Sequence, residues 1–422
     1  MVLRSSLRCA GGCSALESRA EGLRRAQRDY ISSPPHSDMT LPAAPPKDMP
    51  LLPTGDGNIV LFHPQVSEGA IARVSSTLRS RWIGQGPQVE EFERQFSVRF
   101  ANGRSAVSVG SGTDALHLAY LLAGVRAGDE VVSPVFTCTA TNIPLLYIGA
   151  HVKFADVQRG TLNVDPDHVR SLVGPKTKAI VCVHYGGLPC DMDELHVVAR
   201  EWGIPVIEDA AHAVGGSYRG KSIGSISEFT MFSFQAIKHI TTGDGGMVTL
   251  ADAALRPQAD RLRWFGIDRS RKQLGIWEND ITEIGFKYQM TDIAAAMGLA
   301  ALEEFDEVLA LRRRLLSRYE GGLADVPGLR FIGGGYTDRV HAAWLCTVIA
   351  ERRFDLQRKL REHKIESNQV HYRNDRYSIF GGRRDDLPNM DEIEDDYLVL
   401  PLHTKMTTED VERVCDVIQS GW

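Results

Sequence analysis

One lysine stands between an apolar segment and a glycine-rich loop in the stretch "FSFQAIKHITTGDGGMV", residues 232–248. A lysine in such a place is most often a solvated surface residue beside a turn. Its amine can also form a Schiff base with a carbonyl cofactor. The sequence favours the second interpretation of Lys238 only if it supplies the other groups that such a cofactor needs.

A second candidate is the carboxylate in "PVIEDAAHAVGG", where Asp209 follows a short apolar run. A carboxylate at the end of a buried strand is costly without a partner. The protonated ring nitrogen of pyridoxal 5'-phosphate (PLP) would be such a partner, although Asp209 could instead cap a helix. His212 follows three residues later, on the same side as Asp209 if a helix begins there.

The third candidate is a phosphate site in "VGSGTDALHLA", where an apolar run ends in Gly110, Ser111, Gly112 and Thr113 and a helical pattern begins. Small residues expose backbone N–H groups, and a helix N-terminus attracts anions. The motif is neither a Walker loop nor a dinucleotide fingerprint. The hydroxyl of Ser233 could also reach a phosphate, or Ser233 could be an ordinary core serine. Together these stretches supply a phosphate cradle, a carboxylate for a pyridinium and a lysine for an aldehyde.

The elements that would position these groups alternate along the chain from about residue 57. Short apolar runs such as "AIVCV" and "FTMFS" are separated by helical stretches such as "MDELHVVAREWG". Unalternating apolar strands between helices predict an α/β domain with a mostly parallel sheet. Ligands of such sheets collect at the carboxyl ends of strands, which is where the candidate residues lie. We expect a large domain over residues 57–310 and a smaller α+β domain over residues 311–422.

Residues 1–56 differ in composition, with Arg, Ser and Ala first and a proline-rich stretch after them. We expect a disordered extension. An organelle transit peptide and a translation start at Met39 or Met49 are alternatives, although acidic residues argue against the transit peptide.

Composition narrows the function classes. The 422 residues carry a formal net charge of −6 and no long Lys/Arg run, which argues against a nucleic-acid binder. No apolar stretch is long enough to cross a membrane. Seven irregularly spaced cysteines favour reduced thiols in the cytoplasm. Cys9 and Cys13 lack a second pair nearby, so we expect no metal site.

The chain resembles the DegT/DnrJ/EryC1/StrS aminotransferases, which act on nucleotide-linked keto-sugars. The resemblance runs from about residue 60 to the C-terminus. It rests on many motifs in the right order: "GQGPQVEEFERQF", "GSGTDALHLA", "FTCTATN", "GTLNVDP", "VHYGGLPCDMDEL", "VIEDAAHAVGGSYRGKSIGS", "FSFQAIKHITTGDGGMV", "GFKYQMTDIAAAMGL" and "LPLHTKMTTEDV". It implies a fold-type I PLP enzyme that works as a homodimer with active sites at the interface.

The resemblance also implies roles for eight residues: Lys238, Asp209, His212, Gly112, Thr113, Asp114, Ser233 and Lys287. Lys238 matches the Schiff-base lysine, and Asp209 matches the partner of the pyridine nitrogen. His212 matches a position beside the cofactor ring. The segment Gly112–Asp114 matches the backbone that holds the phosphate, and Ser233 matches its hydroxyl ligand.

Two positions depart from the family pattern. Lys287 stands where many relatives have an asparagine that reaches the phosphate in the partner subunit. A lysine could serve there as a point charge. Cys138 stands where many relatives carry an aromatic residue that stacks on the cofactor ring.

The implied reaction moves an amino group from an amino acid, by resemblance L-glutamate, to a keto group at C3 or C4 of a nucleotide-linked deoxysugar, with ping-pong kinetics. Residues that could line the substrate side are His184, Tyr185, His371, Tyr372 and Arg81, and all could equally be structural.

Three other functions fit the sequence less well. Relatives that remove a sugar hydroxyl have histidine in place of the lysine, whereas Lys238 is present here. A non-catalytic regulatory relative should have lost Lys238 or Asp209. A nucleotide-binding oxidoreductase would need the third glycine of its fingerprint, which "GSGTDA" lacks.

Overall fold

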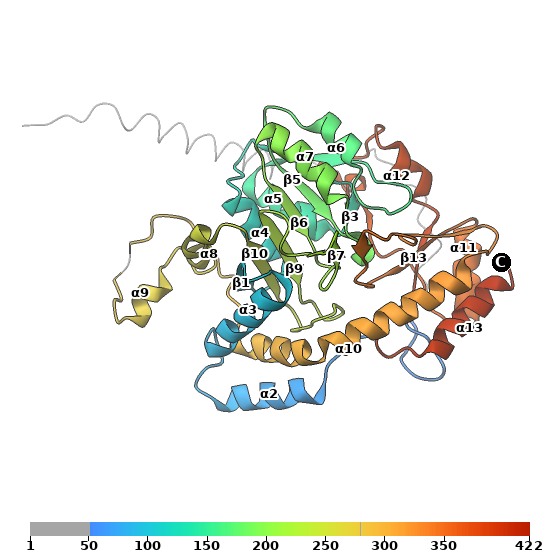
Figure 1. Ribbon diagram of the computed structural model, residues 1–422, viewed down its shortest axis with the longest axis horizontal. Coiled ribbons are helices and arrows are strands. Elements are labelled where there is room, and N and C mark those ends of the chain that lie inside the picture. The colour runs from blue at the N-terminus through green and yellow to red at the C-terminus, as the bar shows by residue number, and fades with distance from the viewer. Residues whose placement is uncertain (1–50, 279) are drawn as a thin grey trace, which may run out of the picture. The chain divides into compact units, whose positions relative to one another are not determined.

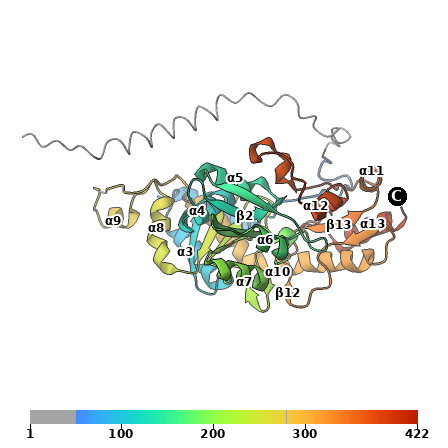
Figure 2. The same cartoon turned by 90° about the horizontal axis from the view of Figure 1, so that it is seen from above.

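Figures 1 and 2 show the protein as a computed structural model, which describes residues 51–278 and 280–422. The predictions made for residues 1–50 lie outside the described residues. That applies to the first fifty residues of the disordered extension expected over residues 1–56, to the two alternatives for it, and to Cys9 and Cys13 as metal ligands. For residues 51–56 the extension stays a prediction.

A seven-stranded sheet occupies the centre of the described chain, in the order β1-β10-β9-β6-β5-β2-β4. The strands are β1 (Ser105–Val109), β2 (Glu130–Pro134), β4 (His151–Ala155), β5 (Thr177–Val183), β6 (Val206–Asp209), β9 (Phe229–Ser233) and β10 (Gly246–Leu250). Neighbours pair in parallel except around β10, which is antiparallel to both β1 and β9. The predicted α/β fold with a mostly parallel sheet is confirmed.

The single antiparallel strand has a simple cause. Parallel neighbours need a crossover connection of a dozen or more residues that returns the chain to the same edge, whereas antiparallel neighbours can be joined directly. β9 and β10 are joined by the loop of residues 234–245, which carries Lys238 and contains no helix. The lysine therefore lies on a loop whose two ends are fixed by paired strands.

Helices cover both faces of the central sheet (Figure 1). The helices of this part of the chain are α2 (Glu68–Arg79), α3 (Pro87–Phe100), α4 (Gly112–Leu122), α5 (Thr139–Ile148), α6 (Pro166–Leu172), α7 (Met192–Trp202), α8 (Arg256–Leu262), α9 (Arg269–Gln273) and α10 (Asp292–Leu323). Of these, α2 packs on α10 and α9 lies away from the sheet. One apolar cluster joins the sheet to α3, α7 and α10, and another joins it to α4, α5 and α8. Because both faces are covered, most strand residues are buried, and most of the buried ones are apolar.

Helices α3 and α10 illustrate how sequence pattern becomes packing. Val89, Phe92 and Phe96 recur at helical spacing and are fully buried. The buried carboxylate of Asp292, at the start of α10, accepts hydrogen bonds from the backbone N–H of Gly86 at 2.8 Å and of Val89 at 3.1 Å. It thereby caps the N-terminus of α3 and fixes the start of one helix to the other.

The C-terminal part of the chain forms a second, antiparallel sheet in the order β11-β13-β15. Its elements and their neighbours are β11 (Leu329–Phe331), β13 (Cys346–Ala350), α11 (Arg353–Glu362), α12 (Pro388–Ile393), β15 (Tyr397–Leu400) and α13 (Thr408–Gln419). A separate apolar cluster joins this sheet to α11, α13 and the second half of α10. The domain limits given above stay a prediction.

Two small sheets connect the central and C-terminal parts. In one, β12 (Arg339–Val340) pairs with β7 (Ser217–Tyr218), which also pairs with β8 (Lys221–Ser222). In the other, β14 (Tyr372–Arg373) pairs with β3 (Phe136–Thr137). These pairings bring C-terminal residues to the edge of the central sheet where β6 and β9 end.

Candidate active site

A cavity of about 270 Å³ lies at the carboxyl ends of β6 and β9, beside the turn that follows β1. Six of the eight predicted residues line it: Gly112, Thr113, Asp209, His212, Ser233 and Lys238. Asp114 and Lys287 do not. The strands that end here, β1, β6 and β9, run in one direction, which explains why residues far apart in sequence converge.

Lys238 is partly buried in this cavity, and burial lowers the pKa of its ammonium to about 7. The nearby Cys138 and Asp209 act in the opposite direction and raise that pKa. The Nζ atom lies 3.5 Å from the centre of the Trp344 ring. An amine with a pKa near 7 is available at neutral pH both as a nucleophile and as a base.

The carboxylate of Asp209 is buried at the end of β6 and accepts two hydrogen bonds. Thr141 Oγ1 donates to Oδ2 at 2.7 Å, and the backbone N–H of Ala211 donates to Oδ1 at 3.1 Å. The hydroxyl of Thr137 bonds Thr141 at 2.8 Å and orients it. Burial raises the pKa of Asp209, so its anionic form calls for a cationic partner in the cavity.

The turn before α4 packs directly on the end of β9. A side chain at Gly112 would place its Cβ 3.0 Å from the Cβ of Ser233, so glycine lets the two backbones meet. Ser111 caps α4, its Oγ accepting the N–H of Asp114 at 3.0 Å. Burial raises the pKa of the Asp114 carboxyl to about 6. The helix N-terminus and the Ser233 hydroxyl form a concave polar site of the kind that holds phosphate.

Three rings with nearly parallel planes form the wall beside Lys238. His212 and Trp344 stack with centroids 3.7 Å apart, and His212 and His371 lie 5.2 Å apart. Burial lowers the pKa of both histidines, so they are neutral. His212 Nδ1 and His371 Nε2 are buried and find no hydrogen-bond partner among the described residues. Orphaned polar atoms in a cavity indicate a missing ligand.

His184, which follows the cavity-lining Val183, is fully buried and bonded at both ring nitrogens. Its Nδ1 accepts the backbone N–H of Cys190 at 3.0 Å, and its Nε2 lies 2.9 Å from the carboxylate of Glu208. Among the described residues, Cys182, His184 and Cys190 come close enough together to hold a metal ion. Since Nδ1 accepts a backbone proton and Nε2 faces Glu208, the ring has no free nitrogen to offer one.

The remaining sequence candidates lie at different distances from the cavity. His371 lines it. Tyr185 is buried, with its ring 6.4 Å from that of His212 and its hydroxyl 3.3 Å from Thr347. Tyr372 belongs to β14 and is partly exposed, and Arg81 is exposed.

Lys287 lies away from the cavity, exposed over the ring of Trp264 at 3.6 Å. The family resemblance predicts that Lys287 acts in the active site of the partner subunit. That role stays a prediction.

Two residues of this site were missed by the sequence analysis. Thr141 lies in the quoted motif "FTCTATN", whose strand-then-helix pattern could have placed its hydroxyl at the sheet edge. Trp344 belongs to the C-terminal part, and no local pattern indicates that its ring reaches Lys238.

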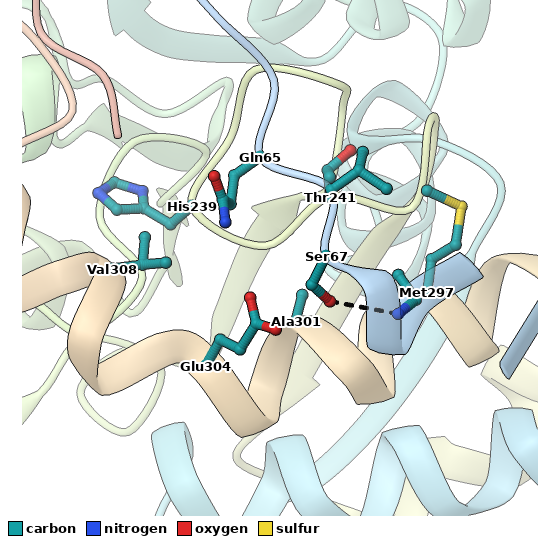
Figure 3. A pocket seen from close by; sticks show the side chains of 10 residues that line it. Gln65, Ser67, His239, Thr241, Met297, Ala301, Glu304 and Val308 are labelled. Atoms are coloured by element: carbon teal, nitrogen blue, oxygen red, sulfur yellow. Dashed lines mark hydrogen bonds between the residues drawn. The ribbon is translucent and has the colours of Figure 1, made fainter. Parts of the chain in front are cut away.

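A second, much smaller cavity of about 10 Å³ is lined in part by residues of the loop that carries Lys238 (Figure 3). His239, Thr241, Gln65 and Glu304 line it, beside the N-cap Ser67 of α2. His239 is buried, and its Nδ1 has no partner among the described residues. The volume suits a single water molecule, and the polar side chains among the lining residues supply partners for it.

The residues of the main cavity fit PLP. A buried carboxylate, a lysine amine with a lowered pKa, a phosphate cradle that a Cβ would disturb, and orphaned imidazole nitrogens are the donor set that the cofactor's ring nitrogen, aldehyde, phosphate and ring hydroxyl require.

Comparison with known proteins agrees with this chemistry. Residues 64–419 match the model of the DegT/DnrJ/EryC1/StrS aminotransferase family. The spore coat polysaccharide biosynthesis protein SpsC of Bacillus subtilis (strain 168) is 35% identical over 375 residues, which cover 84% of this chain and 95% of SpsC.

Solved structures are similar over most of the chain. The sugar aminotransferase CalS13 from Micromonospora echinospora is 34% identical with a TM-score of 0.82, over 86% of this chain and all of that one. Spr1654 from Streptococcus pneumoniae, solved in its PLP form, is 29% identical with a TM-score of 0.81, over 86% and 98%. The chain belongs to the DegT/DnrJ/EryC1/StrS aminotransferase family, and its cofactor is PLP.

Proposed function

We propose that this aminotransferase moves an amino group from an amino acid, L-glutamate in the first instance, to a keto group of a nucleotide-linked deoxysugar. The observation that carries the proposal is the convergence of Lys238, Asp209, Ser233 and the start of α4 on one cavity. Sugar chemistry is supported by relatives, since CalS13 is described as a sugar aminotransferase and SpsC as a polysaccharide biosynthesis protein.

Lys238 supplies the acid–base chemistry. When bound, PLP provides an electron sink that stabilises negative charge on the substrate carbon. A lysine whose pKa burial lowers to about 7 can take up a proton there and return it. Positioned proton transfer of this kind accelerates a reaction roughly 10²–10⁴-fold.

Asp209 and the cradle orient the cofactor. The buried Asp209 carboxylate, held by Thr141 and Ala211, would face the pyridine nitrogen and keep it protonated. Ser233 and the first N–H groups of α4 would hold the phosphate. His212 would offer its orphaned Nδ1 to the cofactor ring.

The proposal includes a homodimer with shared active sites. The projecting segment, residues 264–278 and 280–287, carries α9 and lies away from the central sheet in both views (Figures 1 and 2). It exposes large apolar side chains, among them Leu274 at 79%, Trp277 at 76% and Ile284 at 82%. Soluble chains rarely expose such a group without a partner. In a homodimer, a second copy of the chain would cover these apolar side chains. The same contact would bring Lys287 to the active site of the partner subunit.

The proposed compartment is the reducing cytoplasm. The five cysteines within the described residues are all free: Cys138, Cys182, Cys190, Cys346 and Cys415. Thiols persist in that state in a reducing compartment. Among the described residues, no helix combines the length and the apolarity that crossing a bilayer would demand.

The absorption spectrum of the purified protein tests the function. We expect a yellow band that borohydride bleaches, that is absent from Lys238→Ala, and that persists in a matched control, Lys221→Ala, which removes an exposed lysine of β8. L-glutamate should shift the band, and the correct nucleotide-linked keto-sugar should restore it. A parent protein that stays colourless with added PLP would refute the proposal.

A further inference from the structure

The segment of residues 341–345, called the strap below, connects β12 to β13 and passes beside the loop that carries Lys238. Ala343 adopts a left-handed backbone with φ of 55°, which is uncommon for a residue other than glycine. The N–H groups of Trp344 and Leu345 both donate to the carbonyl of Gly186, at 2.9 and 3.0 Å. The strap is therefore a fixed structure and not a loose connection.

Two hydrogen bonds join the strap to the residues on either side of Lys238. Trp344 Nε1 donates to the carbonyl oxygen of Ile237 at 3.2 Å. His239 Nε2 lies 2.6 Å from the carbonyl oxygen of Ala342 and donates to it. The loop is thus bound to the strap through the backbone carbonyl of the residue immediately before the lysine and the side chain of the residue immediately after it.

The side chain of Trp344 also contacts Lys238 directly. The ring is 2% exposed, and its centre lies 3.5 Å from Lys238 Nζ. A tryptophan face attracts an ammonium group, most strongly where water is excluded. The titratable and charged groups that surround the amine are Cys138, Asp209, His212, His239, Arg312 and His371.

The Trp344 ring can stabilise the ammonium form of Lys238 where other parts of its surroundings disfavour that charge. Burial and the guanidinium of Arg312 both disfavour a charge on Lys238, and the buried histidines are neutral. An aromatic face can stabilise an ammonium there without adding a second anion beside Asp209. The family pattern has an aromatic residue at the position of Cys138, just before α5. The Trp344 ring comes instead from the C-terminal part of the chain.

We propose that Trp344 is a positioning residue, which holds the amine of Lys238 in place and stabilises its protonated form whenever Lys238 is not bonded to the cofactor. The inference rests on the proposed function of Lys238. That is the interval in which the lysine must keep a proton close to the reacting carbon, so the site benefits from a fixed resting place for the ammonium.

The test measures how fast the cofactor-free protein takes up PLP, by the appearance of the yellow band, from pH 5 to 9. Only the neutral amine reacts, so the rate rises with pH through the pKa of Lys238. Trp344→Leu removes the ring and should move the midpoint down by about one pH unit. Uptake at pH 6 should then be faster than in the parent, roughly fivefold for a midpoint that moves from about 7 to about 6.

Two further variants make the result specific. Trp344→Phe keeps an aromatic face but loses the hydrogen bond to Ile237, and should give a smaller shift in the same direction. Phe62→Leu removes a ring that stacks on Trp344 at 5.9 Å without a ring contact to Lys238, and should leave the midpoint in place.

Each of these outcomes tests the inference or the proposed function on which it rests. An unchanged midpoint in Trp344→Phe and Trp344→Leu, or in Trp344→Phe alone if the leucine variant does not fold, overturns the inference. An equal shift in Phe62→Leu also overturns it, because general loosening would then be the cause. A parent protein that develops no band refutes the proposed function of Lys238 instead.

Discussion

Lys238 and Lys287 make nearly the same contact in two different regions of the molecule. Each places its Nζ over a tryptophan ring, at 3.5 Å from Trp344 and 3.6 Å from Trp264. Lys238 lies in the main cavity, and burial lowers its pKa to about 7. Lys287 is exposed on the projecting segment. The ring contact alone does not make a lysine reactive, because the surrounding protein decides whether the amine is neutral at working pH.

The largest effect should come from removing the buried lysine. Lys238→Ala should abolish the yellow band and reduce amino transfer about 10⁴-fold or more, since the variant loses both the covalent anchor and the proton carrier. Steady-state kinetics and the absorption spectrum measure this. Retention of more than a hundredth of the parent rate would contradict the role given to Lys238.

Asp209→Asn should have the next largest effect. It replaces the carboxylate that would face the pyridine nitrogen and also removes a charge that raises the pKa of Lys238. We expect a loss of about 10²–10⁴-fold, because breaking one buried charge pair costs about 3–5 kcal/mol. Kinetics with saturating PLP separate the rate effect from weaker binding. Thr141→Val removes one hydrogen bond to the same carboxylate and should cost less.

The pH dependence sharpens the comparison between the two lysines. The neutral fraction of Lys238 should rise about tenfold between pH 6 and pH 8, because burial lowers its pKa to about 7. PLP uptake by the cofactor-free protein should rise by the same factor, provided that the parallel change in PLP itself is subtracted with a free amine as the reference. A rate that climbs steadily to pH 10 would instead indicate an ordinary solvated lysine.

The smallest effect is expected at Lys287. If it reaches the cofactor phosphate in the partner subunit, Lys287→Ala should weaken PLP binding severalfold at low salt and less at high salt, since exposed charges are screened. Lys287→Arg should preserve most of the affinity. Equilibrium dialysis at two salt concentrations measures both, and an affinity that does not depend on residue 287 would remove it from the site.

The sequence could predict those parts of the site that depend on local order along the chain. Asp209 and Ser233 each end an apolar run, so a parallel sheet brings them to one edge. Lys238 follows in the loop after the second run. The opposite direction of β10 was not predicted, because apolar strands look alike in either direction.

The strap could not be predicted in the same way. Trp344 reaches Lys238 only because the second sheet packs against the first, and its ring forms part of a wall whose other members are His212 and His371. Nothing in "HAAWLC" distinguishes that tryptophan from one in an ordinary core. Contacts of this kind depend on how two sheets far apart in the sequence meet, which is not a local property.

Helix α10 has a consequence for how the protein unfolds. Its 32 residues extend about 48 Å at 1.5 Å per residue. The first half packs on the central sheet, and the second half packs on the C-terminal one. Melting either cluster would leave one half of a continuous helix without its apolar support. The two clusters therefore share one element whose loss destabilises both, which favours a single cooperative thermal transition over two independent ones.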